Sequence, residues 1–399
     1  MLKKILSFFS VALCLLPFVQ GGCAGNSIFP NIPLSNTSPV LSNPIFLVVD
    51  EPNARGYLIN SNNQVNFSDA SLMVLNLTNP LAPTVIKAVN LQNFSGQGVL
   101  NPATKTLYIT NRFSGDPTDV TDRILAVNVD ESSANFLGIQ EFEADSNPFG
   151  IAFDGTNLYT ANIASLDRYL VGNLNQRTRI DFNVEAVGTS TPVNTQNTRE
   201  LVLSPSGQFL YIGNRGDKLL ILDTQQIPVP DPTQSLTLGG SESIDYVLSD
   251  TFSTRGMTSD ANYVYVVEGN PASLKILSDK TLPLVSGQPQ QILISSLAVA
   301  EIPLGNDPNE ITLDSVNQRA YVPNSQDNTV SIIDTNLFVE VARIAMDKNL
   351  PAGIPVGTYP FSVGVYHSGG IPYLYVLNHD SSNITIMNGA TQSIVGHFP

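Results

Sequence analysis

The sequence is poor in cysteine, histidine, tryptophan and charge, and these shortages exclude several kinds of fold and site. Among 399 residues, two are cysteine, three are histidine, none is tryptophan and 13% are charged. Cys14 lies in an apolar N-terminal stretch and Cys23 follows it, so neither can form a disulfide or a cysteine metal site within a mature domain. A sustained 3.6-residue apolar period is also missing, which argues against a mainly helical chain. We therefore expect an all-β fold, since the plentiful Asn, Ser, Thr, Gly and Pro favour turns over helices.

Most of the charges present are acidic, and the net charge is −15. Removal of an N-terminal leader with Lys3 and Lys4 makes the remainder more acidic still. Such a surface repels phosphate backbones, so we expect no nucleic-acid partner. Acidity also keeps an extracytoplasmic protein soluble, and that role requires no specific ligand.

The N-terminus has the features of a secretion signal. Two lysines precede an apolar stretch at 5–19, which is interrupted by Pro17 and is too short for a good transmembrane span. The following Gln-Gly-Gly-Cys23 resembles a bacterial lipoprotein signal, and the resemblance implies that Cys23 is lipidated and becomes the first mature residue. With Ala24 next, it further implies anchoring in the outer membrane as the only membrane attachment. The alternative is an ordinary signal peptide that leaves Cys23 as a free thiol.

An internal repeat organises the rest of the chain. Seven tyrosines lie 51 to 56 residues apart, at Tyr57, Tyr108, Tyr159, Tyr211, Tyr265, Tyr321 and Tyr375. Three residues after each stands Asn60, Asn111, Asn162, Asn214, Glu268, Asn324 or Asn378. A fixed period of this length is typical of repeat architectures, so the tyrosines indicate seven copies of one structural unit.

Each unit contains four short apolar runs separated by turns, which fits one propeller blade. The first run of the first unit is near Ile45–Val49, and the last run of the seventh is Ser393–Phe398, so all seven blades are complete in chain order. We predict a leader at 1–22, a flexible tether at 23–43 and an all-β seven-bladed β-propeller of four-stranded antiparallel blades at 44–399. Radial packing explains the repetition, since a single sheet cannot bury both of its apolar faces.

The two repeated columns have structural explanations. Each tyrosine supplies a large ring to the core between blades, and each asparagine ends a strand where its amide can bond the following turn. The segment Tyr321–Thr335, YVPNSQDNTVSIIDT, resembles the repeat of the YVTN-type β-propellers, as do the connections around Gly305 and Gly357. Blade five departs from this pattern, because Glu268 replaces the asparagine and long loops are expected at 225–253 and 279–291.

No compact catalytic signature is present: there is no phosphate-binding P-loop, nucleophile elbow, metalloprotease helix or haem-attachment motif. His367, His379 and His397 fall on different strands or turns of blade seven, so we interpret them as surface or turn residues. Three aspartates in blade two, Asp116, Asp119 and Asp122, have the hard oxygen ligands that Ca²⁺ prefers, although Asp-rich turns are usually only solvated. No other cofactor is expected.

Aligning the units by their tyrosines places two columns at one mouth of the central channel. The first column is Ile45, Gly96, Phe149, Arg199, Arg255, Asn309 and Phe361, and the second is Phe46, Gln97, Gly150, Glu200, Gly256, Glu310 and Ser362. Ionised groups at a narrow mouth are costly unless they are paired or bind a ligand. The candidate ligand-binding residues are therefore Arg199, Glu200, Arg255, Asn309 and Glu310. Arg112, Arg215 and Glu268 could join this face, and the alternative is a set of ion pairs, Arg199–Glu200 and Arg255–Glu310.

Two functions fit these observations. The first is an envelope-anchored lipoprotein that acts as a non-enzymatic binding or scaffold module for an envelope or extracellular protein or a small anionic ligand. The second is a hydrolase or lactonase in which a glutamate of the cluster is the base and the arginines bind an anionic substrate. Fold alone does not separate them, because propellers serve many functions.

Overall fold

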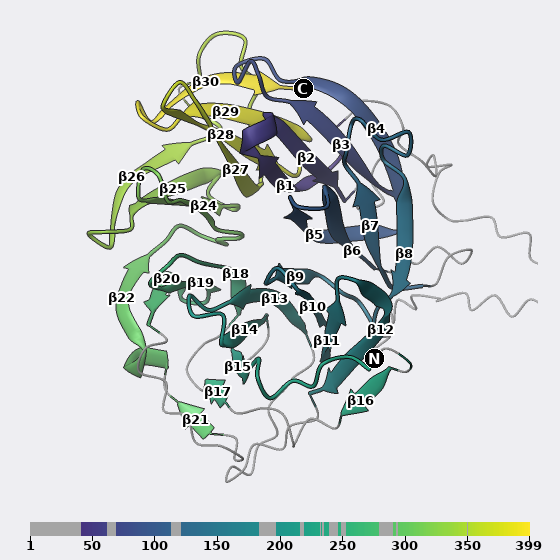
Figure 1. Cartoon of the computed structure of the whole chain (residues 1–399). Coiled ribbons are helices and arrows are strands. Elements are labelled where there is room, and N and C mark those ends of the chain that lie inside the picture. Colours follow the sequence, from purple (N-terminus) through teal and green to yellow (C-terminus); the bar gives the residue numbers. More distant parts are fainter. Residues whose placement is uncertain are drawn as a thin grey trace, which may run out of the picture.

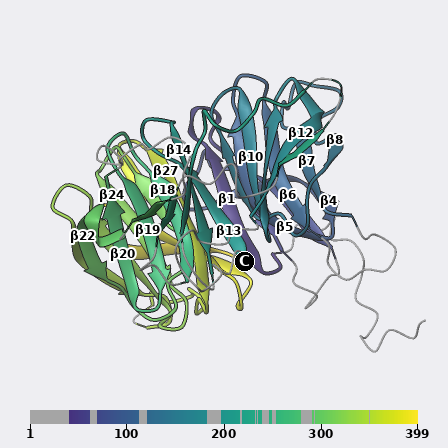
Figure 2. The same ribbon diagram turned by 90° about the horizontal axis from the view of Figure 1, so that it is seen from below.

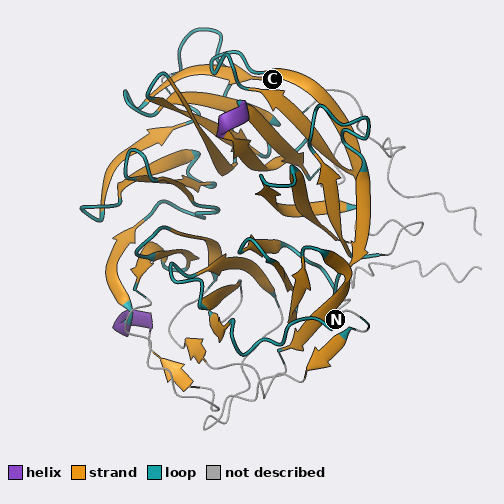
Figure 3. Ribbon diagram, in the orientation of Figure 1, coloured by secondary structure: helices purple, strands orange, loops and turns teal. Residues whose placement is uncertain are grey.

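The computed structural model describes residues 41–61, 69–112, 121–182, 197–215, 219–231, 233, 235–238, 246–248, 253–278, 290–292, 294–348 and 350–399. These residues form seven sheets that stand around a central axis (Figure 1), and nearly all regular structure is strand (Figure 3). Seen after a quarter turn, the blades stand side by side (Figure 2). The chain is therefore an all-β seven-bladed propeller, as predicted.

Each of the first three blades is built from consecutive strands. Blade 1 contains β1 (Pro44–Asp50), β2 (Arg55–Asn60), β3 (Ala70–Asn76) and β4 (Thr84–Gln92), and a 3₁₀ turn, η1 (Glu51–Asn53), joins its first two strands. Blade 2 contains β5 (Phe94–Asn101), β6 (Thr106–Arg112), β7 (Arg123–Asn128) and β8 (Ile139–Glu143). Blade 3 contains β9 (Gly150–Phe153), β10 (Asn157–Asn162), β11 (Ser165–Leu170) and β12 (Asn173–Asp181).

The other four blades follow the same order. Blade 4 contains β13 (Thr198–Leu203), β14 (Phe209–Asn214), β15 (Leu220–Asp223) and β17 (Tyr246–Leu248). Blade 5 contains β18 (Thr254–Ser259), β19 (Val264–Gly269), β20 (Ala272–Leu277) and β22 (Ala298–Pro303), the last preceded by a 3₁₀ turn, η3 (Ile294–Ser296). Blade 6 contains β23 (Thr312–Asp314), β24 (Arg319–Asn324), β25 (Thr329–Asp334) and β26 (Val339–Ala345). Blade 7 contains β27 (Pro360–Ser368), β28 (Ile371–Asn378), β29 (Asn383–Asn388) and β30 (Ser393–Phe398).

Blades 3 and 4 each carry a fifth strand. β16 (Leu236–Leu238) pairs in parallel with β12, and β21 (Gln290–Ile292) pairs in parallel with β17. The predicted loops at 225–253 and 279–291 thus contain strands, and each insertion reaches back to the preceding blade, on the rim of the ring (Figure 1). A hydrogen bond from Arg168 to the carbonyl of Ile227 also holds the first insertion against blade 3. The added strands pair with outer edges whose backbone groups need partners.

The core lies between the blades. In the described part of the chain, buried apolar side chains form seven clusters, one between each pair of neighbouring blades. All seven repeat tyrosines lie on second strands and are at most 3% exposed. Removing such a ring typically costs about 3–5 kcal/mol, so this column accounts for a large share of the packing between blades.

The asparagine column ties strands together within a blade. In four blades the Nδ2 group donates to a hydroxyl on the third strand, in the pairs Asn60–Ser71, Asn162–Ser165, Asn324–Ser331 and Asn378–Thr385, at 2.9 to 3.2 Å. The Oδ1 atoms of Asn60 and Asn324 accept from backbone N–H groups of the preceding connections. We expected bonds to the following turn, and the amides instead bridge neighbouring strands, because a strand end places the side chain beside its partner strand.

In blade 5 the residue at the end of the second strand is a glutamate, and it has a different partner. Glu268 forms an ion pair with Lys275 at 2.8 Å, and both side chains are at most 10% exposed. The two residues are seven positions apart, as are Asn324 and Ser331 in blade 6. A buried charge pair therefore replaces the amide–hydroxyl pair seen in blades 1, 3, 6 and 7.

Within the described residues, the ring closes between blades 7 and 1 without exchange of a strand. Leu41 packs in the cluster between these blades, and the side-chain amide of Asn43 donates to the carbonyl of His379 at 3.1 Å. The backbone N–H of Asn43 also donates to Ser382 at 3.1 Å. Residues 41–43, which the sequence assigned to the tether, therefore form the connection into blade 1. The predicted leader, Cys23 and residues 23–40 of the tether lie outside the described residues.

A left-handed residue precedes the innermost strand of every blade. The backbone angle φ is between 38° and 94° at Asn43, Asn93, Asn147, Asn197, Ser253, Asp307 and Tyr359. Four of these are asparagine, the side chain that tolerates this region best among non-glycine residues. The turn directs the chain from the rim of the ring to the channel, and it determines where the mouth residues begin.

No helix among the described residues has the length and apolar character needed to cross a membrane.

Candidate functional site

The innermost strands begin with an irregularity that brings the predicted residues to the channel. In blade 4 the ladder between β13 and β14 shifts register between Thr198 and Glu200, and in blade 5 that between β18 and β19 shifts between Thr254 and Gly256. Arg199 and Arg255 are the extra residues. A bulge of this kind redirects a side chain out of the regular alternation, so the arginines and the residues that follow them face different directions.

A three-residue bridge crosses the channel at the level of the second column. The Nε2 group of Gln97, from blade 2, donates to Glu200 of blade 4 at 3.0 Å and to Glu310, which precedes β23 in blade 6, at 2.9 Å. All three residues are at most 7% exposed. One amide nitrogen has two hydrogens, so it serves both carboxyl groups at once. We call this set the carboxyl bridge.

Glycine in neighbouring blades allows the bridge to form. A Cβ atom on Gly150 would lie 2.4 Å from the carbonyl oxygen of Arg199, and one on Gly256 would lie 2.7 Å from the Cα of Glu310. Real Cβ atoms do not approach backbone this closely. Only glycine therefore lets blades 3 and 5 approach the backbone that carries Glu200 and Glu310.

The two glutamates of the bridge differ in their electrostatic surroundings. Burial, and next the charge of Glu200, raises the pKa of Glu310 to about 8. Burial also raises the pKa of Glu200, but Arg215 and Arg199 oppose this increase. A proton on the pair is thus held more readily by Glu310, and Glu200, beside the arginines, is the carboxyl that ionises first.

Three arginines gather near Glu200, and two of them lie against one aromatic ring. Arg215 lies 3.4 Å and Arg199 3.7 Å from the same oxygen of Glu200. The guanidinium of Arg199 also stacks 3.6 Å from the ring centre of Phe149, and that of Arg112 lies 5.5 Å from it. Burial, followed by the charge of Arg215, lowers the pKa values of Arg199 and Arg112. We call Arg112, Arg199 and Arg215 the arginine cluster.

Among the described residues, the arginine cluster has fewer acceptors than donors. The Nε atoms of all three arginines are buried without a hydrogen-bond acceptor, while the side chains of Arg199 and Arg215 keep 20% and 16% of their area exposed. Guanidinium groups have five donors and bind carboxylate and phosphate in a fork geometry. The cluster can therefore accept an anion from the solvent side.

The remaining predicted residues have other partners. Arg255 on β18 pairs with Asp307 of the connection between blades 5 and 6 at 3.5 Å, so this ion pair takes the place of the expected Arg255–Glu310 pair. The side chain of Asn309 donates to Ser325 at 2.6 Å and is only 2% exposed, which gives it a packing role. Glu268 is engaged with Lys275 inside blade 5. Arg199, Glu200 and Glu310 are thus brought together, whereas Asn309 and Glu268 are directed elsewhere.

The histidines and aspartates do not form a metal centre in the described part of the chain, where no cluster of three suitable ligands occurs. His367 bridges Glu51 at 2.8 Å and Asp314 at 3.0 Å, joining blades 1, 6 and 7. His379 lies against the Tyr359 ring, with the centres 5.9 Å apart. Asp116 and Asp119 lie outside the described residues, so the calcium prediction stays a prediction.

Sequence reasoning overlooked the role of Gln97 and Phe149, although both stood in the aligned columns. Charged side chains suggested the site, whereas the residue that connects the two carboxyls is neutral and the one that supports the arginines is aromatic. The usable signal was position: Gln97 occupies the same column as Glu200 and Glu310. In a closed ring, residues of one column converge on the axis.

Comparison with known proteins supports the fold and no specific activity. No family model matches the chain, and no curated protein matches its sequence. Hydrazine synthase from Kuenenia stuttgartiensis is similar in structure, with a TM-score of 0.59 at 16% identity over 94% of this chain and 99% of that one. A putative 6-phosphogluconolactonase from Bacteroides uniformis has a TM-score of 0.52 at 16% identity, over 78% and 88% of the two chains. The Cps50 (Swd1) β-propeller domain from Myceliophteria thermophila has a TM-score of 0.59 at 10% identity, over 89% and 98%. Identities this low show a shared propeller fold alone.

Proposed function

We propose that the protein is an envelope-anchored β-propeller lipoprotein that binds a small anionic ligand at its arginine cluster without catalysing a reaction. The observation that carries the proposal is the excess, among the described residues, of guanidinium donors over acceptors in the arginine cluster. In the part of the chain that the structure describes, the three guanidinium groups face two carboxyl groups, Glu200 and Asp122, while burial raises the pKa of Glu310 and favours its neutral form. In a chain with a net charge of −15, a local positive excess of this kind attracts an anion.

The anchor is part of the same proposal. It is supported by the lipoprotein-like signal ending at Cys23 and by the resemblance of Tyr321–Thr335 to YVTN-type repeats. Labelling of expressing cells with a palmitate analogue should mark the wild-type chain and spare Cys23→Ser. An unlabelled wild-type chain would remove the lipid from the proposal and leave the arginine cluster unaffected.

A hydrolase or lactonase is the second candidate, and one observation favours it. The pKa of Glu310, about 8, is near the value that suits a general acid or base at neutral pH. Glu310 is 3% exposed, however, and its carboxyl accepts from Gln97 below the arginines. A substrate held by the guanidinium groups would have to displace this bond before a proton could be transferred. Binding alone requires no such movement.

Calorimetric titration at low ionic strength tests the binding proposal with inorganic phosphate, citrate and gluconate as probes. We expect at least one of them to bind, and Arg199→Gln and Arg215→Gln to weaken that binding at least tenfold. Arg343→Gln is the matched control, since this arginine is exposed and pairs with Glu340 on β26. Failure of all three anions to bind, or equal loss in the control, would contradict the proposal. Lactone hydrolysis that disappears in Glu310→Gln would favour the enzyme instead.

A further inference from the structure

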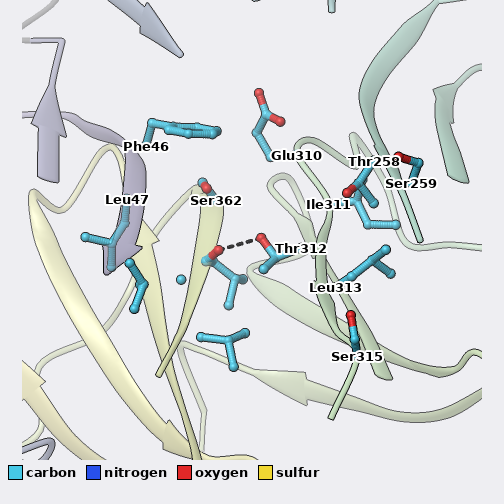
Figure 4. A pocket seen from close by; sticks show the side chains of 14 residues that line it. Phe46, Leu47, Thr258, Ser259, Glu310, Ile311, Thr312, Leu313, Ser315 and Ser362 are labelled. Carbon is cyan, nitrogen blue, oxygen red and sulfur yellow. Dashed lines mark hydrogen bonds between the residues drawn. The ribbon is translucent and has the colours of Figure 1, made fainter. Parts of the chain in front are cut away.

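A cavity of about 400 Å³ occupies the channel beside the carboxyl bridge, between blades 1, 5, 6 and 7. It arises where the innermost ladder of blade 6 is short: β23 has three residues, whereas β1 has seven and β27 has nine. In Figure 4, Phe46 and Glu310 lie at one end of this cavity and Ser315 lies at the other. Glu310 therefore contributes both to the bridge and to the cavity.

The chemistry of the cavity differs from that of the arginine cluster. Five hydroxyl side chains line it, namely Thr258, Ser259, Thr312, Ser315 and Ser362, and the rest of the wall is mainly apolar. Among the described residues of the lining, Glu310 is the one that can ionise. Burial and Glu200 raise its pKa to about 8, so at neutral pH it presents a neutral carboxyl group. An anion would find no countercharge here, and a cation would find no carboxylate.

Hydroxyl groups select ligands that both donate and accept. A serine or threonine oxygen has one donor and two acceptor sites, and a protonated carboxyl also offers both. Thr312 is oriented by its bond to the carbonyl of Val363 at 2.5 Å, drawn as the dashed line in Figure 4. Phe46, which is partly exposed, adds a flat apolar surface at the end near Glu310. A ligand with hydroxyls around a compact carbon ring matches this combination.

The size of the cavity limits the class of ligand that it can hold. Liquid water occupies about 30 Å³ per molecule, so 400 Å³ corresponds to roughly a dozen water molecules. A monosaccharide fits in this space. Small-molecule pockets of about 300–1,000 Å³ with a mostly apolar wall and a few placed polar groups are the usual binding sites of proteins.

We infer that this cavity is a second ligand site, which binds an uncharged sugar of monosaccharide size. The inference goes beyond the proposed function, because it uses different residues, a different ligand class and no arginine. The two sites share no residue: the arginine cluster comes from blades 2 and 4, whereas the cavity is lined from blades 1, 5, 6 and 7, with Glu310 as the one bridge residue in its described lining.

The test uses glucose, methyl α-glucoside and methyl β-galactoside as probes, with gluconate as the charged comparison. Saturation-transfer NMR on the purified chain detects contact, and titration of the same signals measures affinity. We expect at least one neutral sugar to bind. Thr258→Val removes a hydroxyl at constant volume and Ser362→Val also fills the cavity, so each should weaken binding at least tenfold. Ser393→Val, on the exposed side of β30, is the matched control and should bind as wild type.

Three results would overturn the inference: no neutral sugar gives a saturation-transfer signal, binding persists in both Thr258→Val and Ser362→Val, or Arg199→Gln abolishes sugar binding as well. The last result would place the sugar at the arginine cluster. Circular dichroism and the melting temperature of each variant show that it is folded, and the conservative Thr258→Ser variant, which keeps the hydroxyl, should retain sugar binding. Loss of anion binding in Arg199→Gln with sugar binding intact separates this inference from the proposed function.

Discussion

Replacing Glu310 by glutamine should make the protein progressively more stable than the wild type as the pH rises. Glutamine has the shape of a protonated glutamate, and its carbonyl oxygen can still accept the hydrogen bond from Gln97, which is 2.9 Å from Glu310 in the wild type. The substitution therefore keeps the geometry of the carboxyl bridge. It removes only the need to bury a negative charge when the proton leaves.

The size of the effect follows from the pKa. Glu310 has a pKa of about 8 in the folded chain, against an ordinary value of 4.5. Between these pH values the folded protein binds a proton that the unfolded chain has lost, so wild-type stability falls as the pH rises, and the fall is complete once the pH has passed 8. Each pH unit in this interval is worth about 1.4 kcal/mol. The glutamine variant should gain roughly 4 kcal/mol relative to the wild type between pH 5 and pH 8.

Urea unfolding of both proteins at several pH values between 5 and 9 measures this difference directly. The exposed Glu301→Gln on β22 is the control and should show a difference that does not change with pH. The infrared carbonyl band of a protonated carboxyl should also be present in the wild type at pH 6 and absent from Glu310→Gln. A stability difference that stays within about 1 kcal/mol across the range would refute the assignment of the proton to Glu310.

Three further changes test the fold around the site. Glu268→Asn leaves Lys275 buried without its partner and should lower the free energy of unfolding in urea by about 3 kcal/mol. The double variant Glu268→Asn/Lys275→Ser recreates the amide–hydroxyl pair and should recover most of this stability. Equal losses of stability in the single and double variants would argue against the ion pair. Gly150→Ala should lower the free energy of unfolding by about 2 kcal/mol or more, because the added Cβ would overlap the carbonyl of Arg199. Gly172→Ala is the control and should change stability little, because the space around Gly172 is open. Burial raises the pKa of Asp167 to about 6, so the stability of the wild type should fall as the pH rises from 3.8 to 6. Asp167→Asn should flatten this part of the pH profile of unfolding. An unchanged slope would contradict the raised pKa of Asp167.

The fold was predictable because the information lies within each repeat. Tyr57 and its six equivalents predict both the number of blades and the second strand of each, since burial of one ring per blade is a local requirement of the packing. The fifth strands were not predictable. β16 and β21 pair in parallel with strands of blades that precede them in the chain. A strand of three residues is too short to show a periodic pattern from which its partner strand could be predicted.

The candidate site was predictable in part. Alignment on the tyrosines correctly placed Glu200 and Glu310 at one level, because residues of one column share one height in a ring. It could not show that Gln97 reaches both of them, since that contact joins residues 103 and 213 positions apart in the chain. Nor could it show that Asn309 turns to Ser325. Side-chain directions at these positions depend on bulges and left-handed residues that leave little trace in composition.

The way the ring closes has a mechanical consequence. The four main strands of each blade are successive in the chain, and in the part of the chain that the structure describes, blades 7 and 1 are joined through Leu41, Asn43 and the packing between them rather than by a shared strand. A molecule pulled by the chain that precedes Leu41 would be loaded first at this seam. The force would act on side-chain contacts and a few hydrogen bonds, which would break one after another. The other six junctions between blades would carry little of this force. For the same reason, a circularly permuted chain that begins at another blade-to-blade connection should fold to the same ring, with its weakest junction moved to the new ends.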